Sequence, residues 1–265
     1  DTVASLRVLG PAGSRRLEQL SRVFEIGTRI GALGGMLTCI WEKPMWAIVP
    51  IKTFDRAKQR LANVLSEEER RSLMLAMARD VLTCLAKSTR LCGVLIVSRT
   101  PEADALAQSF GTERYAESPE ANLAEALEQA TRHLITNFNA EGVMIVPADV
   151  PGISAEELDQ ILGAHEQVTV LPDNDHIGTN GLICSPPLCM PYVFDGKSFK
   201  PHVDAAFASG ITPKVVPGTG FALDIDVPTD LIEVSRQAPY TQTAIYLEKS
   251  GIMARLDALS TSQSG

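Results

Sequence analysis

The sequence lacks an apolar run long enough to cross a lipid bilayer. One candidate, residues 30–41 (IGALGGMLTCIW), falls short of the roughly 18–20 residues that a membrane-spanning helix needs. No small-residue cleavage site clearly follows it, as a secretory signal would require. We therefore expect no membrane partner and a cytoplasmic location. Residues 1–44 are expected to form a poorly ordered N-terminal extension, with Met45 as a candidate natural start.

Basic residues are also fewer than acidic ones. The chain has 24 Lys and Arg against 32 Asp and Glu, which gives a formal net charge of −8 and a pI near 5.1. A general nucleic-acid binder gains its affinity from many Lys and Arg contacts to phosphates, so this balance argues against nucleic acid as a partner. It leaves open a local cationic pocket for a small phosphorylated ligand.

The spacing of cysteine and histidine excludes two further classes of site. The five cysteines include no C-x-x-C pair, and none lies in a Cys/His cluster suited to zinc. No Ser/His/Asp or Cys/His spacing is present, so catalysis by a protein nucleophile is not expected.

From Met45 onward, strand-like and helix-like patterns alternate. Apolar runs predict strands at 45–49, 93–98, 142–147, 168–171, 181–184, 212–216 and 221–225. Helical periodicity and capping residues predict a long helix that starts at Ser66 and has an apolar stripe through Leu85, and further helices at 101–110, 122–136, 154–165 and 198–209, with a last turn from Pro228. This alternation predicts one three-layer α/β domain over residues 45–256, with a mostly parallel mixed sheet. Residues 257–265 (DALSTSQSG) are small and polar, so we expect a disordered tail.

Ligands of open α/β sheets bind beyond the carboxyl ends of the strands, and four segments at such ends stand out. The first is 47–61 (AIVPIKTFDRAKQRL), which contains neither G-x-G-x-x-G nor a Walker A pattern. Lys52, Lys58 and Arg60 could instead supply the positive charge that nucleotide phosphates need. The alternative is a solvated cationic turn that leads into a helix.

The second segment is VPADVP, residues 146–151. Asp149 follows a buried strand and lies between two prolines that fix the local backbone. A carboxylate held in this way suits Mg²⁺, which prefers oxygen ligands. Helix capping explains Asp149 less well, because Ser154 already has that role.

The third segment is LDIDVPTDL, residues 223–231. Asp224 and Asp226 alternate about Ile225, so in an extended strand both carboxylates face the same side. Two like charges so close are costly unless a cation lies beside them. Capping of the next helix by Asp226 is the alternative, and both roles are compatible.

The fourth segment combines DHIGTNGL (175–182) with FDGKSFKPH (194–202). Thr179 lies in a turn rich in hydrogen-bond donors, and Gly196, Lys197 and Ser198 precede a helix whose N-terminus suits an anion. His202, one turn into that helix, could reach the same pocket. The alternative for Ser198 is an ordinary N-cap.

Together these segments describe a nucleoside triphosphate held by cations, a metal held by carboxylates and a second anionic substrate at a helix end. Transfer of a nucleotidyl group needs in-line positioning and charge neutralisation more than a protein nucleophile. The function inferred from the residues is therefore nucleotidyl transfer.

The order of the motifs resembles that of the 2-phospho-L-lactate guanylyltransferases, which act in biosynthesis of coenzyme F-420. The matching segments are IVPIKTFDRAKQRL, SEEERRSLMLAMARDVL, PADVP, GTNGL, SFKPHVDAAFASG and LDIDVPTDL, over about 45–234. The resemblance implies a GT-A-like domain, GTP, Mg²⁺ and a phosphorylated three-carbon acid whose phosphate attacks the α-phosphorus of GTP. The acid is 2-phospho-L-lactate, phosphoenolpyruvate or 3-phospho-D-glycerate.

The resemblance also implies roles for particular residues. Lys52, Lys58 and Asp149 would be catalytic; Lys52, Lys58, Arg60 and Asn122 would bind the nucleotide; Thr179, Gly196 and Ser198 would bind the acid; Asp149, Asp224 and Asp226 would hold magnesium. It further suggests hand-over of a labile product to the next transferase. Two alternatives stay open: a nucleotidyltransferase for a molybdopterin or sugar phosphate, and a nucleotide-binding regulatory module without catalysis.

Overall fold

The computed structural model of the protein describes residues 44–52 and 58–262. These residues fall within one compact unit. The N-terminal extension expected at 1–44 lies outside the described residues except for Pro44, so that expectation stays a prediction. No helix within the described ranges is long and apolar enough to span a bilayer.

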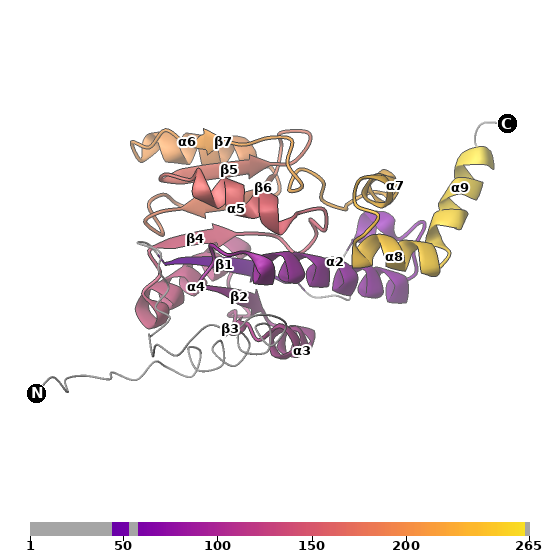
Figure 1. Ribbon diagram of the computed structural model, residues 1–265, viewed down its shortest axis with the longest axis horizontal. Helices are drawn as coiled ribbons and strands as arrows, with labels where there is room; N and C mark the ends of the chain where they lie inside the picture. Colours follow the sequence, from indigo (N-terminus) through magenta and orange to yellow (C-terminus); the bar gives the residue numbers. More distant parts are fainter. Residues whose placement is uncertain (1–43, 53–57, 263–265) are drawn as a thin grey trace, which may run out of the picture. The chain divides into compact units, whose positions relative to one another are not determined.

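A mixed sheet forms the centre of the unit (Figure 1). Its strands are β1 (Met45–Pro50), β2 (Gly93–Ser98), β3 (Glu113–Ala116), β4 (Gly142–Ile145), β5 (Val168–Pro172), β6 (Thr179–Cys184) and β7 (Lys214–Val215). They are ordered β3-β2-β1-β4-β6-β5-β7, and β6 runs antiparallel to both of its neighbours while the other pairs are parallel. The predicted mostly parallel mixed sheet is confirmed.

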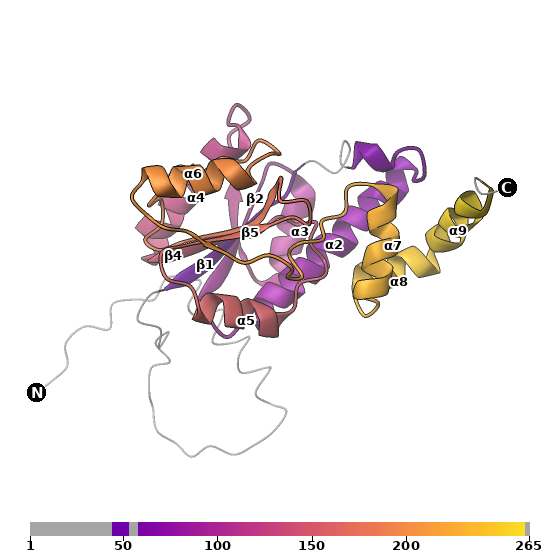
Figure 2. The same cartoon turned by 90° about the horizontal axis from the view of Figure 1, so that it is seen from above.

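Helices cover both faces of this sheet. The helical elements of the described residues are the 3-10 turn η2 (Gln59–Leu61) and the α-helices α2 (Glu67–Lys87), α3 (Pro101–Phe110), α4 (Leu123–Phe138), α5 (Ala155–Gly163), α6 (Phe199–Ala208), α7 (Pro228–Gln237), α8 (Gln242–Lys249) and α9 (Ile252–Ser262). The last three lie beyond the sheet, where α8 packs on α2 and both α7 and α9 pack on α8 (Figure 1). Figure 2 shows α4 and α6 on one side of the sheet and α5 on the other. The alternation of β1 explains the two cores, because Ala47 and Val49 pack with α2 and α5, whereas Trp46 and Ile48 pack with α4.

Local sequence sets the ends of the longest helix. Ser66 accepts a hydrogen bond from the N–H of Glu69 at 3.2 Å, and the Glu69 carboxylate accepts the N–H of Ser66 at 2.8 Å. This is the reciprocal capping box predicted from the sequence. Leu73, Met77, Val81 and Leu85 recur on one side of α2 and are buried. Their burial attaches α2 to the sheet.

The C-terminal helices continue further than the sequence predicted. Asp80 of α2 accepts the N–H groups of Gln242 and Thr243, both at 2.8 Å, which fixes the first turn of α8 against α2. The subsequent α9 runs through Ser262, so the expectation of a disordered tail from residue 257 was wrong for 257–262. Ala and Leu at 258 and 259 are strong helix formers and extend a helix that begins with buried Ile252.

Two strand assignments also differ from the prediction. Residues 221–225 form no strand: Phe221 and Ile225 are buried, yet this segment joins the β4 loop through the Ile225 N–H to Asp149 carbonyl bond of 3.2 Å instead of a ladder. The edge strand β3 was missed, since its four residues are only partly buried or exposed and show no apolar run.

Candidate functional site

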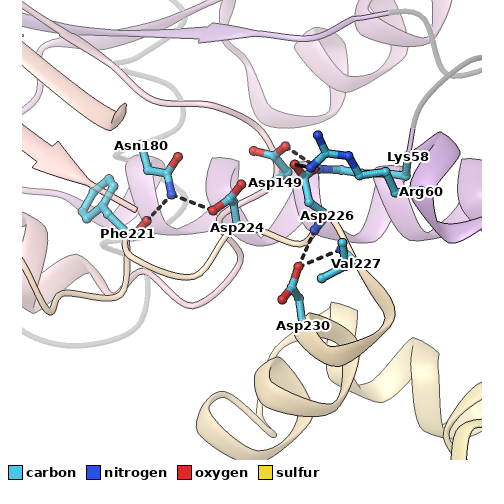
Figure 3. A network of polar contacts seen from close by, with 9 residues as sticks. All are labelled: Lys58, Arg60, Asp149, Asn180, Phe221, Asp224, Asp226, Val227 and Asp230. Carbon is cyan, nitrogen blue, oxygen red and sulfur yellow. Dashed lines mark hydrogen bonds and ion pairs between the residues drawn. The ribbon is translucent and has the colours of Figure 1, made fainter. Parts of the chain in front are cut away.

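A polar cluster lies beyond the carboxyl ends of β1 and β4 (Figure 3). These two strands are neighbours in parallel register, with Ile48 opposite Ile145. Asp149 follows β4, Lys58 comes from the segment after β1, and Asp224 and Asp226 belong to the segment before α7. Parallel strands present their carboxyl ends at one edge, which explains how residues distant in sequence meet there.

Lys58 is the centre of this cluster. Its Nζ donates to Asp149 Oδ2 at 2.6 Å and to Asp226 Oδ1 at 2.7 Å, and its side chain is only 7% exposed. The backbone of Lys58 is left-handed, with φ of 51°, immediately before η2. A non-glycine residue adopts this conformation at a cost of about 1 kcal/mol, so the two ion pairs help to hold it there.

The charges of the cluster shift one another's pKa values. Burial by itself would lower the pKa of Lys58, but Asp149 and Asp226 outweigh it and raise that pKa above its ordinary value. For Asp226, burial acts to raise the pKa, and the attraction of Lys58 and Arg60 outweighs it, so the pKa is lowered. Lys58 and Asp226 are therefore both charged at neutral pH.

Asp224 differs from its neighbours. Burial raises its pKa, opposed by a hydrogen bond from Asn180, and repulsion from Asp149 and Asp226 raises it further. Asn180 Nδ2 donates to Asp224 Oδ1 at 3.0 Å and to the Phe221 carbonyl at 2.9 Å (Figure 3). The three carboxylates are thus close enough to repel one another, while Lys58 directly bridges only Asp149 and Asp226.

Backbone contacts fix the two acidic loops against each other. A Cβ added at Gly220 would lie 2.5 Å from the carbonyl oxygen of Gly152, so only glycine permits this approach. Asp230, in the first turn of α7, accepts the N–H groups of Asp226 and Val227, both at 2.8 Å. These contacts set the position of the Asp226 carboxylate before any ligand binds.

The donor set fits a hard divalent cation. Among the described residues, no group of three or more His, Cys, Asp or Glu side chains is arranged around one metal position. Nevertheless, Asp149 and Asp226 already share one cation, the ammonium of Lys58. Repulsion from both of these carboxylates raises the pKa of Asp224. Carboxylate oxygens without nitrogen or sulfur ligands are the set that Mg²⁺ prefers.

The other predicted cations lie at the exposed side of the cluster. Arg60 Nη1 is 3.6 Å from Asp226 Oδ2, and its side chain is 74% exposed. Lys52 is exposed and contributes to lowering the pKa of Asp226. The structure thus brings Lys52, Lys58 and Arg60 around one carboxylate.

Asn122 is the predicted nucleotide residue that stands apart. Its Oδ1 accepts the N–H of Glu125 at 3.0 Å, and the Glu125 carboxylate accepts the N–H of Asn122 at 3.0 Å. This capping box starts α4 and is its structural role here. Both of these side-chain hydrogen bonds stay within the first turn of α4, and neither involves the Lys58 cluster.

Two of the three predicted acceptor residues meet directly. The N–H of Thr179, at the start of β6, donates to Ser198 Oγ at 3.1 Å, and both residues are buried. Ser198 does not cap α6 with its side chain, so the capping alternative was wrong. Gly196 has φ of +89° in the turn before α6, and a Cβ added there would meet nothing within 4 Å.

Three further residues support the site. Asn180 orients Asp224, Asp230 fixes the backbone of Asp226, and His202, which the sequence analysis expected to reach the acceptor pocket, contacts Thr179. For Asp230 the signal was present, since an acidic residue at the third position of a helix commonly accepts N–H groups at the helix start. The roles of Asn180 and His202 depend on contacts that no local pattern encodes.

Comparison with known proteins gives a consistent result over most of the chain. The family model described as "Guanylyl transferase CofC like" matches residues 45–264. A phosphoenolpyruvate guanylyltransferase of Sphaerobacter thermophilus is 33% identical over 195 residues, 73% of this chain and 93% of the relative. A 2-phospho-L-lactate guanylyltransferase of Methanobrevibacter smithii is 31% identical over 207 residues, 77% of this chain and 90% of the relative.

Solved structures share the fold at lower identity. A putative nucleotide-diphospho-sugar transferase from Desulfovibrio desulfuricans aligns with a TM-score of 0.67 and 17% identity, over 80% of this chain and 97% of the other. A 4-diphosphocytidyl-2C-methyl-D-erythritol synthase aligns with a TM-score of 0.52 and 14% identity, over 74% and 99% of the two chains. These similarities establish the fold of nucleotidyltransferases.

Proposed function

The chain belongs to the CofC-like guanylyl transferase family, and we propose that it transfers GMP from GTP to a small phosphorylated three-carbon acid. The resemblance inferred from the sequence is confirmed by the family match over residues 45–264. The acceptor is 2-phospho-L-lactate, phosphoenolpyruvate or 3-phospho-D-glycerate, and the product would enter biosynthesis of coenzyme F-420. Relatives named for the first two of these acids are about equally similar to this chain, 31% and 33% identical.

The observation that carries this proposal is the cluster of Lys58, Asp149 and Asp226 at the carboxyl end of β4. In the reaction, a phosphate oxygen of the acid attacks the α-phosphorus of GTP, the bond from that phosphorus to the α–β bridging oxygen breaks, and pyrophosphate leaves. Negative charge accumulates on the phosphate oxygens during this exchange, so fixed cations stabilise the transition state. Asp149 and Asp226 keep Lys58 in its charged form, and Lys52 and Arg60 lie nearby.

Magnesium belongs to the same proposal. Asp149, Asp224 and Asp226 would hold the ion, which when bound would neutralise charge on the triphosphate and orient it. The protein's own part is to pre-position these carboxylates, through Asn180 for Asp224 and through Asp230 for Asp226.

The acid would bind next to this cluster. Thr179 begins β6, which runs antiparallel to β4, so Thr179 lies alongside the end of β4 from which Asp149 follows. The Thr179 and Ser198 hydroxyls and the turn at Gly196 would bind its anionic groups. On the nucleotide side we assign Asn122 to the guanosine, on the strength of the resemblance.

The two alternatives lose support from the comparisons. The putative nucleotide-diphospho-sugar transferase and the 4-diphosphocytidyl-2C-methyl-D-erythritol synthase described above share the fold at 17% and 14% identity, whereas the named guanylyltransferases are 31–33% identical to this chain. A regulatory module without catalysis would not need Asp149, Asp224 and Asp226 close together. A cytoplasmic location and hand-over of the product to the next transferase complete the proposal.

The test is pyrophosphate release by the purified protein with Mg²⁺ and GTP, with each of the three acids supplied separately. We expect release with one acid or more, and Asp149→Asn should abolish it without unfolding the protein. Asp204→Asn, at an exposed position of α6, is the matched control and should keep full activity. A folded wild-type protein that releases no pyrophosphate with any acid would refute the proposal.

A further inference from the structure

His202 is fully buried beside the proposed acceptor site. Its Nε2 lies 2.9 Å from the backbone nitrogen of Val193, and its Nδ1 lies 2.9 Å from Thr179 Oγ1. The ring also packs edge-on against Phe194, with 4.7 Å between ring centroids. Both ring nitrogens therefore have one partner each, and the ring orientation is fixed.

These partners determine where the proton of the imidazole lies. A backbone N–H can only donate, so Nε2 must accept from Val193 and carry no proton. Burial lowers the pKa of His202 to about 4, against an opposing effect of Asp195, so the ring is neutral at pH 7. A neutral imidazole has one N–H, which must then be at Nδ1. His202 consequently donates to the hydroxyl oxygen of Thr179.

The direction of this bond decides what Thr179 can offer a ligand. Its oxygen already accepts from His202, so its own proton is left to donate. Ser198 is in the same state, because its oxygen accepts the N–H of Thr179 at 3.1 Å. Over the part of the chain that the structure describes, neither hydroxyl donates a hydrogen bond to a protein acceptor once His202 is the donor to Thr179. Thr179 and Ser198, 6% and 3% exposed, are thus two neighbouring buried donors whose protons have no acceptor among the described residues.

We propose that His202 is a positioning residue that fixes the Thr179 hydroxyl as a hydrogen-bond donor to an anionic oxygen of the acceptor acid. This inference rests on the proposed function and specifies how the acid is recognised. An ionised carboxylate or phosphate oxygen only accepts hydrogen bonds, and it matches a pair of hydroxyl donors whose oxygens each already accept one hydrogen bond. Without His202, the hydroxyl oxygen of Thr179 would lose the donor that fixes the orientation of its O–H group.

The first experiment separates acid recognition from nucleotide binding. His202→Phe keeps the ring and its packing on Phe194 but removes both nitrogens. We expect the KM for the acid to rise about tenfold, the scale of one hydrogen bond to a charged group, with the KM for GTP unchanged. His165→Phe is the matched control, because His165 Nδ1 lies 2.8 Å from the Thr169 hydroxyl, on β5. It should leave both constants unchanged.

A double-mutant cycle tests whether His202 acts through Thr179. Thr179→Val alone should raise the KM for the acid, and adding His202→Phe should raise it no further, because the hydroxyl is already gone. Independent, multiplying effects would overturn the inference, as would an equal loss of GTP affinity or an unchanged KM for the acid in His202→Phe.

A measurement on the wild-type protein covers the case in which the variants fail to fold. Imidazole ¹⁵N chemical shifts at pH 7 should show His202 as the neutral tautomer protonated at Nδ1. A proton at Nε2, or a charged imidazolium, would overturn the inference without reference to turnover. Absence of turnover with every acid would instead refute the proposed function, and the NMR result would still decide the state of His202.

Discussion

Replacing Lys58 by methionine removes the cation between Asp149 and Asp226 while keeping a side chain of similar length. Loss of one partner from a fully buried ion pair costs about 3–5 kcal/mol, because a charge is left without a counterion. Here Asp149 and Asp226 are 24% and 45% exposed, so water screens the carboxylates that remain. We therefore expect the free energy of unfolding to fall by about 2 kcal/mol.

Thermal unfolding followed by circular dichroism at pH 7 and low salt measures this loss. For a unit of this size, about 2 kcal/mol corresponds to a fall in Tm of roughly 4–8 °C. Lys200→Met is the matched control, because Lys200 and Asp204 form an ion pair in which both side chains are well exposed, 79% and 58%. That control should cost at most about 0.5 kcal/mol.

Magnesium should affect the two proteins differently. In Lys58→Met the carboxylates of Asp149 and Asp226 repel each other without an ammonium between them, so added Mg²⁺ should raise Tm more than in the wild type. Turnover of GTP should nevertheless fall by about 10²–10³-fold, the usual effect of removing one group that stabilises transition-state charge. A Lys58→Met protein as stable as Lys200→Met would refute the ion pairs, and an equal response to Mg²⁺ would refute the shared cation position.

Two further predictions concern the loops and pH. Gly220→Ala places a Cβ 2.5 Å from the Gly152 carbonyl oxygen, so the free energy of unfolding measured in urea should fall by about 1–3 kcal/mol. In the control Gly152→Ala the Cβ would lie 3.4 Å from the Gly220 carbonyl oxygen, so the loss should be clearly smaller. Equal losses would contradict the close contact. The pKa of His202 is lowered to about 4 in the fold, so as pH falls below about 6.5 the imidazole takes up a proton in the unfolded chain before it does so in the folded protein. The contribution of His202 to the free energy of unfolding should therefore be greatest above pH 6.5 and decline by about 2–3 kcal/mol on the way to pH 4. His202→Phe should lack this part of the decline in urea unfolding, and an unchanged pH slope in that variant would contradict the assignment.

The sequence predicts most of the fold because its elements are locally consistent. Capping residues and the apolar stripe on α2 agree about where that helix starts and which side is buried. The antiparallel direction of β6 could not be predicted from the sequence, because a strand buried on both faces has the same apolar composition whether it runs parallel or antiparallel to its neighbours. The false strand at 221–225 has a related cause: Phe221 and Ile225 are buried under a loop, and burial alone does not require a ladder.

The candidate site divides in the same way. Asp149, Asp226 and Lys58 could be found from residue type and position at strand ends, although Lys58 is separated from its two partners by 91 and 168 residues. The sequence placed His202 near the acceptor pocket, but the partners of Asn180 and His202 could not be predicted, because each hydrogen-bonds a residue distant in the chain, Asp224 and Thr179 respectively. Local patterns identify groups that carry charge, and tertiary contacts decide which groups orient them.

In the function that we propose, Lys58 takes the place of a glycine-rich phosphate-binding loop. Such a loop offers backbone N–H groups to phosphates, whereas here a buried ammonium is held at the end of β4 by two carboxylates that also raise its pKa. Asp149 and Asp226 therefore act on the cation as well as on any metal between them. Loss of activity in Asp149→Asn alone does not distinguish release of Lys58 from loss of a metal ligand. Comparison with Lys58→Met does, because only the aspartate substitution should abolish the stabilisation by Mg²⁺ that the lysine substitution is expected to enhance.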